Sequence, residues 1–472
     1  MESDQKKERK SIRVPHIYVI LIAILLIAFA ATFIIPSGEF ERAENENGTI
    51  VLLPETFSEM EKTYLSLFDL MYAVPTGLIE AGEIVFGVLM IGGMFAVLEK
   101  SGLVGIGISK LSRTFGHRPF FVIPALMIPL ALLTTFTSAI ELAIVFAPVV
   151  IPLMVRLGFD RMTALAAVLI STVAGFTAAV TGPATVGVAH DVSGIELYSG
   201  YGYRALIFII ILTIGILFVC LYASKVKKDA GASLVSNDGI DQEFVLSSGD
   251  IENEKASKPQ LLAVFVLLSG VLLMIYGLIE WGWYFRELGG LYLTMGLLIG
   301  LITGLGPSKI AETFNKGFQS ILLGALVVGI ARSISVILEN GQILDTVVQG
   351  TSQLVSVMPS AFTAVFMMIV QGGFNFLVPS GSGQAVITMP IMSGLADLVG
   401  ITRQTAVLAF QFGDGFANIF YPTSGYFMAT LAIARVGWDK WMKFVWPLLI
   451  IWYVLAIVFL VIAQMINGGA GL

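Results

Sequence analysis

The sequence predicts an all-α polytopic membrane protein with two inverted-topology repeats, each containing a re-entrant helical hairpin and a broken transmembrane helix. Composition, recurring apolar runs and a self-similarity between the two halves predict this class. Of the 472 residues, 56% are hydrophobic and 13% are charged, whereas about a quarter of the residues are charged in an ordinary soluble domain. A chain of this length has too few polar residues to cover a soluble surface, which excludes a soluble enzyme.

The charge and the motif content exclude several further classes. The net charge is −6 and no basic domain stands apart, so we expect no nucleic-acid partner. Cys220 is the single cysteine, and the three histidines are far apart with no HExxH spacing, so we expect no disulfide and no metal centre. Because no Walker A motif occurs, ATP-driven transport has no support, and we expect no cofactor.

Apolar runs of about 20 residues are long enough to span a bilayer as helices. Such runs recur near 17–35, 84–98, 119–135, 139–157, 162–180, 205–223, 260–279, 289–305, 318–338, 361–378, 384–399, 404–420, 423–434 and 444–464. Several of them are too short, or too broken by Gly and Pro, to cross a bilayer alone.

The order of the predicted parts follows from these runs and from two polar stretches. The parts are a cytoplasmic N-terminal tail (1–15), a first transmembrane helix (16–36), an acidic outer loop (37–67), a first inverted repeat (68–225) with hairpin 119–157, a disordered cytoplasmic linker (226–258), connecting transmembrane helices (259–307), a second inverted repeat (308–465) with hairpin 361–399, and a C-terminal tail (466–472). The linker is rich in Asp, Glu, Ser and Gly, a composition typical of disorder.

The N-terminus also resembles a secretory signal, since Lys and Arg precede the first apolar run and Ala28-Phe29-Ala30 resembles a cleavage site. We favour an uncleaved first span, because the run continues through Ile35 and many more apolar segments follow.

The placement of basic residues predicts the orientation, because cytoplasmic loops of membrane proteins carry an excess of Lys and Arg. We place the N-terminus inside, let full spans alternate and let each hairpin enter and leave on one side. Of the 27 basic residues, 21 then lie inside, Arg332 lies within a span, and five lie outside: Arg42, Lys62, Arg204, Arg286 and Arg403.

The two halves of the chain resemble one another at an offset of 242 residues. Nine identities fall in the 30 positions from 138 to 167, among them Ser138 with Ser380 and Pro148 with Pro390. Chance would give about two or three, so the sequence contains an internal repeat. The charge placement puts hairpin 119–157 inside and hairpin 361–399 outside, so the repeats are predicted to be inverted. Inverted repeats with discontinuous helices are typical of secondary transporters.

Each half contributes a hairpin tip and a helix break, where Gly and Pro occur together with Ser and Thr. The tips lie at 134–141 and 375–384, and the breaks at 177–185 and 413–425. Unwinding leaves free amides at a helix start, which suit a carboxylate, and free carbonyls at a helix end, which suit a cation. The candidate substrate-binding residues are Thr137, Ser138, Glu141, Thr181, Gly182, Asn375, Ser380, Gly381, Ser382, Gly383, Asp414, Asn418, Thr423 and Ser424. The alternative for any single Ser or Thr is a hydrogen bond between packed helices.

Charged residues at membrane depth are costly and often functional. Glu141 follows the first tip, and Asp414 lies in the second break. For Arg332 we expect a structural ion pair with Glu339 or Glu99. His190 and Asp191 are predicted to form an ordinary helix-end loop near the outer surface, and Glu80 and Glu83 to lie at the membrane interface.

These tips and breaks resemble those of the YfcC family, within the C4-dicarboxylate anaerobic carrier (DcuC-like) group of the ion transporter superfamily. The resemblance rests on 135–148, Thr181-Gly182-Pro183, 375–383 and 413–425, and covers nearly the whole chain except the tails and the linker. It implies two inverted repeats, two hairpins and a homodimer whose scaffold and transport parts move as an elevator. The group is also similar to short-chain fatty acid and aminobenzoyl-glutamate carriers.

The resemblance also implies a substrate class. Members of the group are labelled as C4-dicarboxylate carriers or as basic amino acid antiporters of the arginine/ornithine kind. The Ser-Asn-Thr tip of Na⁺-coupled relatives is replaced here by Thr137-Ser138-Ala139 and Pro379-Ser380-Gly381, a departure that weighs against Na⁺ coupling.

The leading hypothesis is therefore a secondary active transporter of a bacterial-type inner membrane, either an antiporter or a proton-coupled carrier of basic amino acids. Tip and break amides with Ser138, Ser380 and Ser382 would hold the α-carboxylate, and Asp414 and Glu141 the cationic end. Its partners would be a small-molecule substrate, a coupling ion or counter-substrate, the lipid bilayer and a second copy of the chain. The alternatives are a C4-dicarboxylate carrier and, from another class, a membrane-embedded enzyme or complex subunit.

Overall fold

A computed structural model describes residues 17–44, 50–104, 106, 119–235 and 257–466. The predicted tail 1–15 lies outside the described residues, as do most of the linker and most of the C-terminal tail. The described chain is almost entirely helical, and six of its helices are long and apolar enough to cross a membrane. The predicted class, an all-α polytopic membrane protein, is confirmed.

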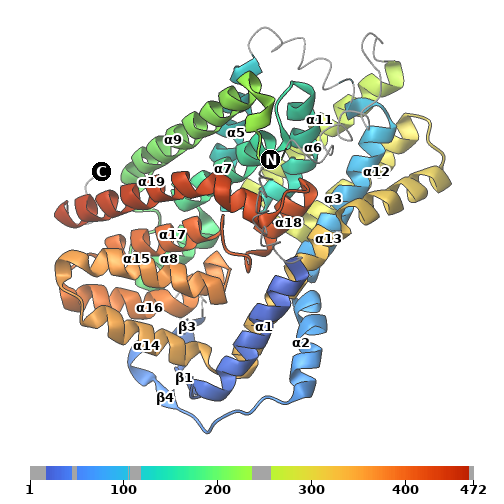
Figure 1. Ribbon diagram of the computed structural model, residues 1–472. Helices are drawn as coiled ribbons and strands as arrows, with labels where there is room; N and C mark the ends of the chain where they lie inside the picture. The colour runs from blue at the N-terminus through green and yellow to red at the C-terminus, as the bar shows by residue number, and fades with distance from the viewer. Residues whose placement is uncertain (1–16, 45–49, 105, 107–118, 236–256, 467–472) are drawn as a thin grey trace, which may run out of the picture.

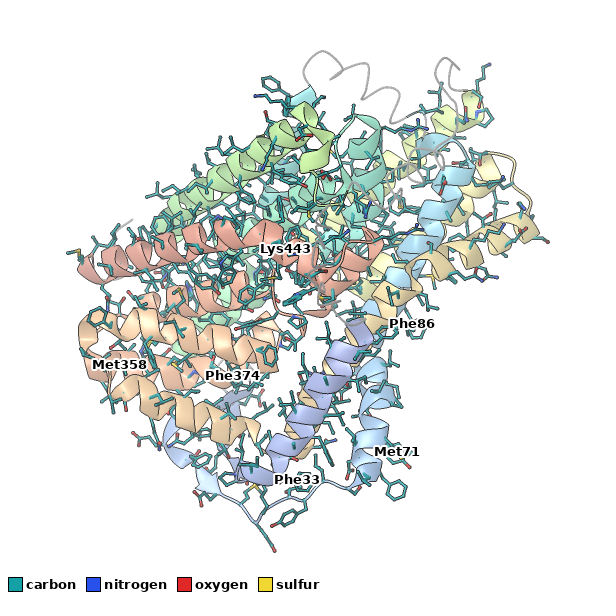
Figure 2. The ribbon with its side chains drawn as sticks, in the orientation of Figure 1. Phe33, Met71, Phe86, Met358, Phe374 and Lys443 are labelled. Carbon is teal, nitrogen blue, oxygen red and sulfur yellow. The ribbon has the colours of Figure 1, made fainter. Side chains whose placement is uncertain are left out.

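The helices form two bodies, which lie to the right and to the left in Figure 1. Body A is built around α3 and α13. It contains α1 (Ile17–Ile34), α2 (Leu67–Glu80), α3 (Gly82–Lys100), α11 (Lys258–Glu280), α12 (Phe285–Ile302) and α13 (Pro307–Asn340). Large apolar side chains of this body face outward, as Met71 and Phe86 do in Figure 2, where they are 66% and 63% exposed. Such a surface fits a lipid environment.

Body B contains the remaining helices, which are arranged around α7 and α17. They are α5 (Val122–Thr137), α6 (Leu142–Arg156), α7 (Arg161–Thr177), α8 (Val188–Ser193), α9 (Tyr201–Lys228), α14 (Leu344–Ser356), α15 (Ser360–Leu377), α16 (Gly381–Val399), α17 (Arg403–Ala417), α18 (Gly425–Ile433) and α19 (Trp438–Met465). The short helical segments η2 (Pro119–Phe121) and η3 (Pro183–Gly187) precede α5 and α8, and η4 (Ala230–Ala232) follows α9. Every residue of α7 is buried, so this helix forms the centre of body B.

The glycines explain how the helices of body A approach one another so closely. A methyl group on Gly317 of α13 would collide with the backbone of Gly92 and Gly93 in α3. The two helices therefore cross with backbone against backbone, which is the contact that small residues permit between membrane helices.

The loop 37–67, which was predicted to lie outside, has more structure than the sequence predicted. Strands β1 (Gly38–Glu39) and β4 (Ser58–Glu59) pair antiparallel, as do β2 (Arg42–Glu44) and β3 (Ile50–Leu52), and η1 (Pro54–Thr56) lies between β3 and β4. Asp345 at the start of α14 accepts a hydrogen bond from the Phe40 amide at 3.0 Å and pairs with Arg42 at 2.9 Å. These contacts hold the loop against body B.

The structure has a pair of helices in each predicted hairpin range, α5–α6 and α15–α16, with the tips between them. Helix α7 ends at Thr177 and is followed by the irregular stretch before α8, where the first break was predicted. The inversion of one half relative to the other stays a prediction.

The predicted start of the second break is wrong. Helix α17 continues through Gly413, Asp414 and Gly415 to Ala417, and the chain unwinds only at Asn418. A methyl group on Gly413 would lie 2.5 Å from the Met368 carbonyl oxygen of α15, and one on Gly415 would collide with Thr177 of α7. These glycines therefore permit close helix packing. A sequence pattern alone does not distinguish glycines with this role from glycines that break a helix.

Candidate functional site

A polar cavity of about 1030 Å³ lies between body A and body B. Both hairpin tips and both breaks line it, so segments from four distant parts of the chain meet at one place. Ten candidate residues line this cavity: Thr137, Ser138, Glu141, Ser380, Gly381, Ser382, Gly383, Asn418, Thr423 and Ser424. The other four, Thr181, Gly182, Asn375 and Asp414, lie behind this lining.

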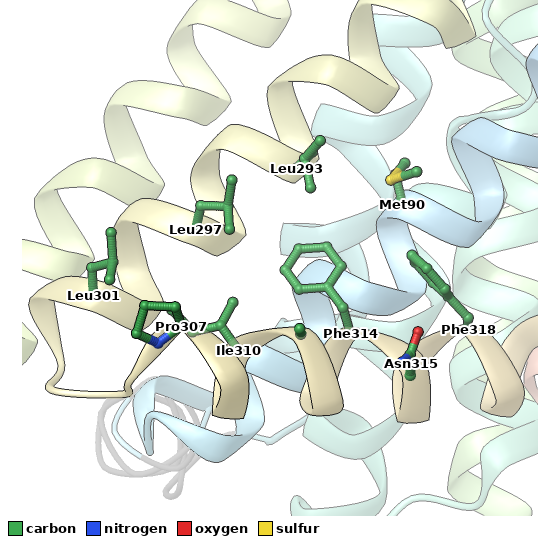
Figure 3. Close-up of a pocket in the computed structure, with 10 residues that line it drawn as sticks. Met90, Leu293, Leu297, Leu301, Pro307, Ile310, Phe314, Asn315 and Phe318 are labelled. Carbon is green, nitrogen blue, oxygen red and sulfur yellow. The ribbon is translucent and has the colours of Figure 1, made fainter.

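A second cavity, of about 370 Å³, lies between α3, α12 and α13 and is shown in Figure 3. Its lining is apolar except for Asn315, with Met90, Leu297 and Phe314 among its members. A cavity lined this way offers no charge for a polar substrate, so the polar cavity is the candidate site.

The first tip and the first break are tied together by hydrogen bonds. Ser138 ends α5 in the left-handed conformation, with φ 58°, and its Oγ lies 3.2 Å from Thr185 Oγ1. Thr135 accepts hydrogen bonds from the amides of Val180, at its Oγ1, and of Thr181, at its carbonyl oxygen. A methyl group on Gly182 would collide with Ser138 Oγ, so this contact requires glycine.

Arg204 supports the same break from behind. Its guanidinium donates to the backbone carbonyl oxygens of Ala179, Val180, Tyr198 and Ser199 at 2.7–3.1 Å. The sequence placed Arg204 in an outer loop. In the structure the residue belongs to the first turn of α9, and its side chain is buried in the protein. The guanidinium satisfies carbonyl groups that the end of α7 and the loop before α9 leave free.

The predicted loop at His190 and Asp191 is also wrong. Both residues belong to helix α8, and His190 is fully buried with its Nδ1 3.0 Å from the Glu196 carbonyl oxygen. Neither residue lines the polar cavity.

The second tip begins with a capped helix start. Ser380 precedes α16, and its Oγ accepts a hydrogen bond from the Gly383 amide at 3.3 Å. Gly381 and Ser382 form the first turn and line the cavity. This turn carries the positive end of the α16 dipole, which suits a negatively charged group in the cavity.

A buried network of amides joins the second tip to the second break. Asn375 Nδ2 donates to Asp414 Oδ1 at 2.6 Å and to Gln384 Oε1 at 3.1 Å. Asn418 Nδ2 donates to the same Asp414 oxygen at 3.0 Å, and Ser424 Oγ donates to Asn418 Oδ1 at 3.0 Å. Asp414 is thus held from both sides and is fully buried.

Three glutamines of this layer, Gln371, Gln384 and Gln411, were not among the predicted site residues. All three are buried, and Gln384 Nε2 donates to Gln371 Oε1 at 2.7 Å. A polar side chain within an otherwise apolar span was the available signal, because such residues are costly at membrane depth.

Body A contributes the charged wall of the cavity. Arg332 pairs with Glu80 at 2.8 Å and with Glu339 at 3.1 Å, and all three line the cavity. The expected pair with Glu339 is confirmed, but the second partner is Glu80, which was predicted to lie at the membrane interface. Across the cavity, Tyr284 Oη donates to Glu141 Oε1 at 3.3 Å and so links α12 to the first tip.

Apolar helices that enclose a polar cavity at two hairpin tips and two helix breaks define a polytopic membrane transporter. The model of the C4-dicarboxylate anaerobic carrier family, DcuC, matches residues 14–465. The chain belongs to this family.

Two relatives and two solved structures are similar to the chain over nearly its whole length. It is 33% identical to an Escherichia coli K12 protein named "Putative basic amino acid antiporter YfcC", over 98% of this chain and 99% of that one. It is 27% identical to an uncharacterized Haemophilus influenzae protein over 94% and 96%. The Alcanivorax borkumensis YdaH transporter is 16% identical, with TM-score 0.43, over 97% and 100%. Neisseria gonorrhoeae MtrF, described as an efflux pump, is 14% identical, with TM-score 0.44, over 97% of each chain.

Proposed function

We propose that this transporter exchanges basic amino acids of the arginine/ornithine kind, or carries them with protons, across a bacterial-type inner membrane. The observation that carries the proposal is the charge of the polar cavity. Its charged lining residues are Glu80, Glu141 and Glu339 against Arg332, which is already paired with two of them. A net negative cavity favours a cationic substrate, because like charges are costly in a medium of low dielectric constant.

The substrate would lie with its α-carboxylate toward body B. The first turn of α16, with Ser380, Gly381, Ser382 and Gly383, and the hydroxyl of Ser138 supply donors for it. The cationic end would face Glu141 and the two carboxylates of body A. In this arrangement Asp414 lies behind the cavity and positions Asn375 and the cavity-lining Asn418, because its Oδ1 accepts a hydrogen bond from each of them.

The position of the cavity supports an elevator-type mechanism. The tips and breaks belong to body B, whereas Glu80, Arg332 and Glu339 belong to body A. A movement of body B along body A would carry the substrate and leave these charges behind. A homodimer with body A at its interface, and a cytoplasmic N-terminus, belong to the same proposal.

The second candidate is a C4-dicarboxylate carrier, which the description of the matching family favours. It would place both carboxylates at helix starts and on Arg332. Against it stands the pairing of Arg332, which leaves a dicarboxylate facing three carboxylates in the cavity.

Exchange in proteoliposomes tests these alternatives. Vesicles loaded with ornithine and containing the purified protein are expected to take up radiolabelled arginine, and external succinate is expected not to compete. Uptake of succinate without arginine would establish the dicarboxylate carrier instead. Absence of flux for both substrates, in vesicles with correctly folded protein, would favour the membrane-embedded enzyme or complex subunit.

A further inference from the structure

The turn between α11 and α12 brings aromatic side chains to the wall of the polar cavity. Four aromatic residues of the described chain line this cavity: Phe176, Trp283, Tyr284 and Tyr426. Phe176 and Tyr426 are 4% and 6% exposed, whereas Trp283 is half-buried and Tyr284 is 44% exposed. The two residues of the turn therefore have ring surface that a substrate can reach, and the substrate orientation proposed above uses neither of them.

Tyr284 lies beside the carboxylate that is proposed to hold the cationic end of the substrate. Its Oη donates to Glu141 Oε1 at 3.3 Å, so the phenol ring and this carboxylate are neighbours across the cavity. A carboxylate accepts about four hydrogen bonds, so this single donor leaves Glu141 able to bind a cation as well. A cation that pairs with Glu141 therefore lies next to an aromatic ring.

The Tyr284 ring is held in place by its own element and its neighbours. Tyr284 is the N-cap residue of α12, and its amide donates to Glu287 Oε2 at 3.0 Å. Its ring meets that of Phe285 edge to face, with the ring centroids 5.4 Å apart. Phe285 is 2% exposed and packs against Gly87 of α3, where a methyl group would lie 2.5 Å from the Phe285 ring. A ring that is already ordered loses little conformational entropy when a ligand stacks on it.

Trp283 is ordered by contacts with α11. A methyl group on Gly277 would lie 2.4 Å from the Trp283 indole, so the indole lies directly against the backbone of that helix. The Trp283 amide donates to the Gly277 carbonyl oxygen at 2.9 Å, and the ring of Trp281 lies 5.4 Å away, centroid to centroid. Trp283 and Tyr284 together form an ordered aromatic wall next to Glu141.

We propose that this aromatic wall makes the cavity select a guanidinium over an ammonium group. The selectivity rests on the proposed function and names the substrate end that the cavity favours. Glu141 attracts both groups, because each carries one positive charge. A guanidinium is planar and weakly hydrated, so it can stack on an aromatic ring while its N–H groups pair with a carboxylate. An ammonium is compact and strongly hydrated, so it gains less from the ring.

Ligand-induced stabilisation of the full-length protein in detergent tests the selectivity. The rise of Tm with ligand concentration gives an apparent Kd for arginine and for ornithine, and the wild type is expected to bind arginine more tightly. Tyr284→Leu removes the ring and is expected to weaken arginine binding about threefold to thirtyfold, and ornithine binding by less than about twofold. Tyr284→Phe keeps the ring and loses the hydroxyl, so it should keep the preference for arginine.

Tyr276→Leu is the matched control. Tyr276 belongs to α11 and is 51% exposed, but it does not line the cavity, so both affinities should equal those of the wild type. Equal affinity of the wild type for the two ligands would overturn the proposal, and so would an equal loss of both affinities in Tyr284→Leu.

Exchange in proteoliposomes separates this selectivity from the proposed function. Stabilisation by arginine without arginine–ornithine exchange would overturn the proposed function and leave the guanidinium site. Exchange with an arginine preference that survives in Tyr284→Leu would leave the proposed function and overturn the selectivity. Stabilisation by succinate alone would overturn both.

Discussion

Gly182 shows how a single missing side chain fixes the geometry of the first tip. We expect Gly182→Ala to displace Ser138 and to lower stability by about 1–3 kcal/mol, the usual cost of overpacking a filled site. The reason is that the new methyl group would collide with Ser138 Oγ and lie 2.8 Å from the Ala179 methyl carbon. Chemical denaturation of the purified variant measures the loss, and arginine–ornithine exchange should fall with it.

Gly394→Ala is the control for this variant. It lies in α16 and has no atom within 4 Å of the new methyl position. Equal stability of Gly182→Ala and Gly394→Ala would show that the tip tolerates the extra methyl group.

Glu141 is the one acidic side chain of body B in the cavity lining. We expect Glu141→Gln to lower arginine exchange about tenfold to a hundredfold, because a charged partner contributes about 1.5–3 kcal/mol. The loss should appear as a higher KM for arginine, measured by initial rates in proteoliposomes.

Tyr284→Phe separates charge from hydrogen bonding, since Tyr284 Oη is the donor to Glu141. This variant keeps the carboxylate, so the rate of exchange should stay within about twofold of wild type. A twofold change is at the low end of what the loss of one hydrogen bond costs. A loss equal to that of Glu141→Gln would mean that Glu141 acts through Tyr284 and not on the substrate.

At this scale the sequence predicted much of the candidate site. Thr137, Ser138 and Ser382 could be chosen because hydroxyls beside Gly and Pro identify irregular backbone. The place of Asp414 could not be predicted, because it depends on where α17 ends: Asn418, one turn later at the unwound end, lines the cavity, whereas Asp414 lies in the layer behind it. The roles of Gln371 and Gln384 depend on contacts between α15 and α16 that no local pattern encodes.

Helix α9 stabilises a break that belongs to another element. We expect Arg204→Lys to loosen the stretch between α7 and α8, because an ammonium group cannot reach four carbonyl oxygens as the guanidinium fork does. Hydrogen exchange of the backbone amides from 178 to 187 should become faster in this variant. The matched control is Arg42→Lys, whose guanidinium pairs with Asp345 and donates to the Phe40 carbonyl oxygen, and which should leave this stretch unchanged.

Elements with a strong apolar signal were predicted well, and amphipathic ones were missed. The runs near 205–223 and 444–464 correspond to α9 and α19. Helix α9 extends a few residues further at both ends, and α19 extends further mainly at its start. Helix α14 was missed because its buried residues are separated by Gln, Ser and Thr. Helix α2 was missed because Asp69, Pro75 and Glu80 interrupt its apolar run.

The proposed topology can be tested on the whole molecule with single cysteines in a Cys220→Ser background. Lys228→Cys and Glu55→Cys both place the new thiol at exposed positions, at the end of α9 and in the outer loop. In intact cells a membrane-impermeant maleimide should label Glu55→Cys, and Lys228→Cys only after the cells are opened. The opposite labelling would reverse the orientation, and labelling of both in intact cells would contradict the placement of 37–67 and α9 on opposite sides.

The α13–α18 contact joins the two bodies beside the cavity with small side chains. A methyl group on Gly425 would lie 3.0 Å from the Val328 Cα, and one on Gly324 would lie 3.1 Å from the Ala429 carbonyl oxygen. Because glycine lies at both of these points, the two helices meet there backbone against backbone, and few side chains have to be rearranged there when one helix shifts along the other. Larger residues at these four positions would slow the turnover of the carrier and leave its substrate preference intact. Natural variants that differ in transport speed alone are therefore expected to differ here.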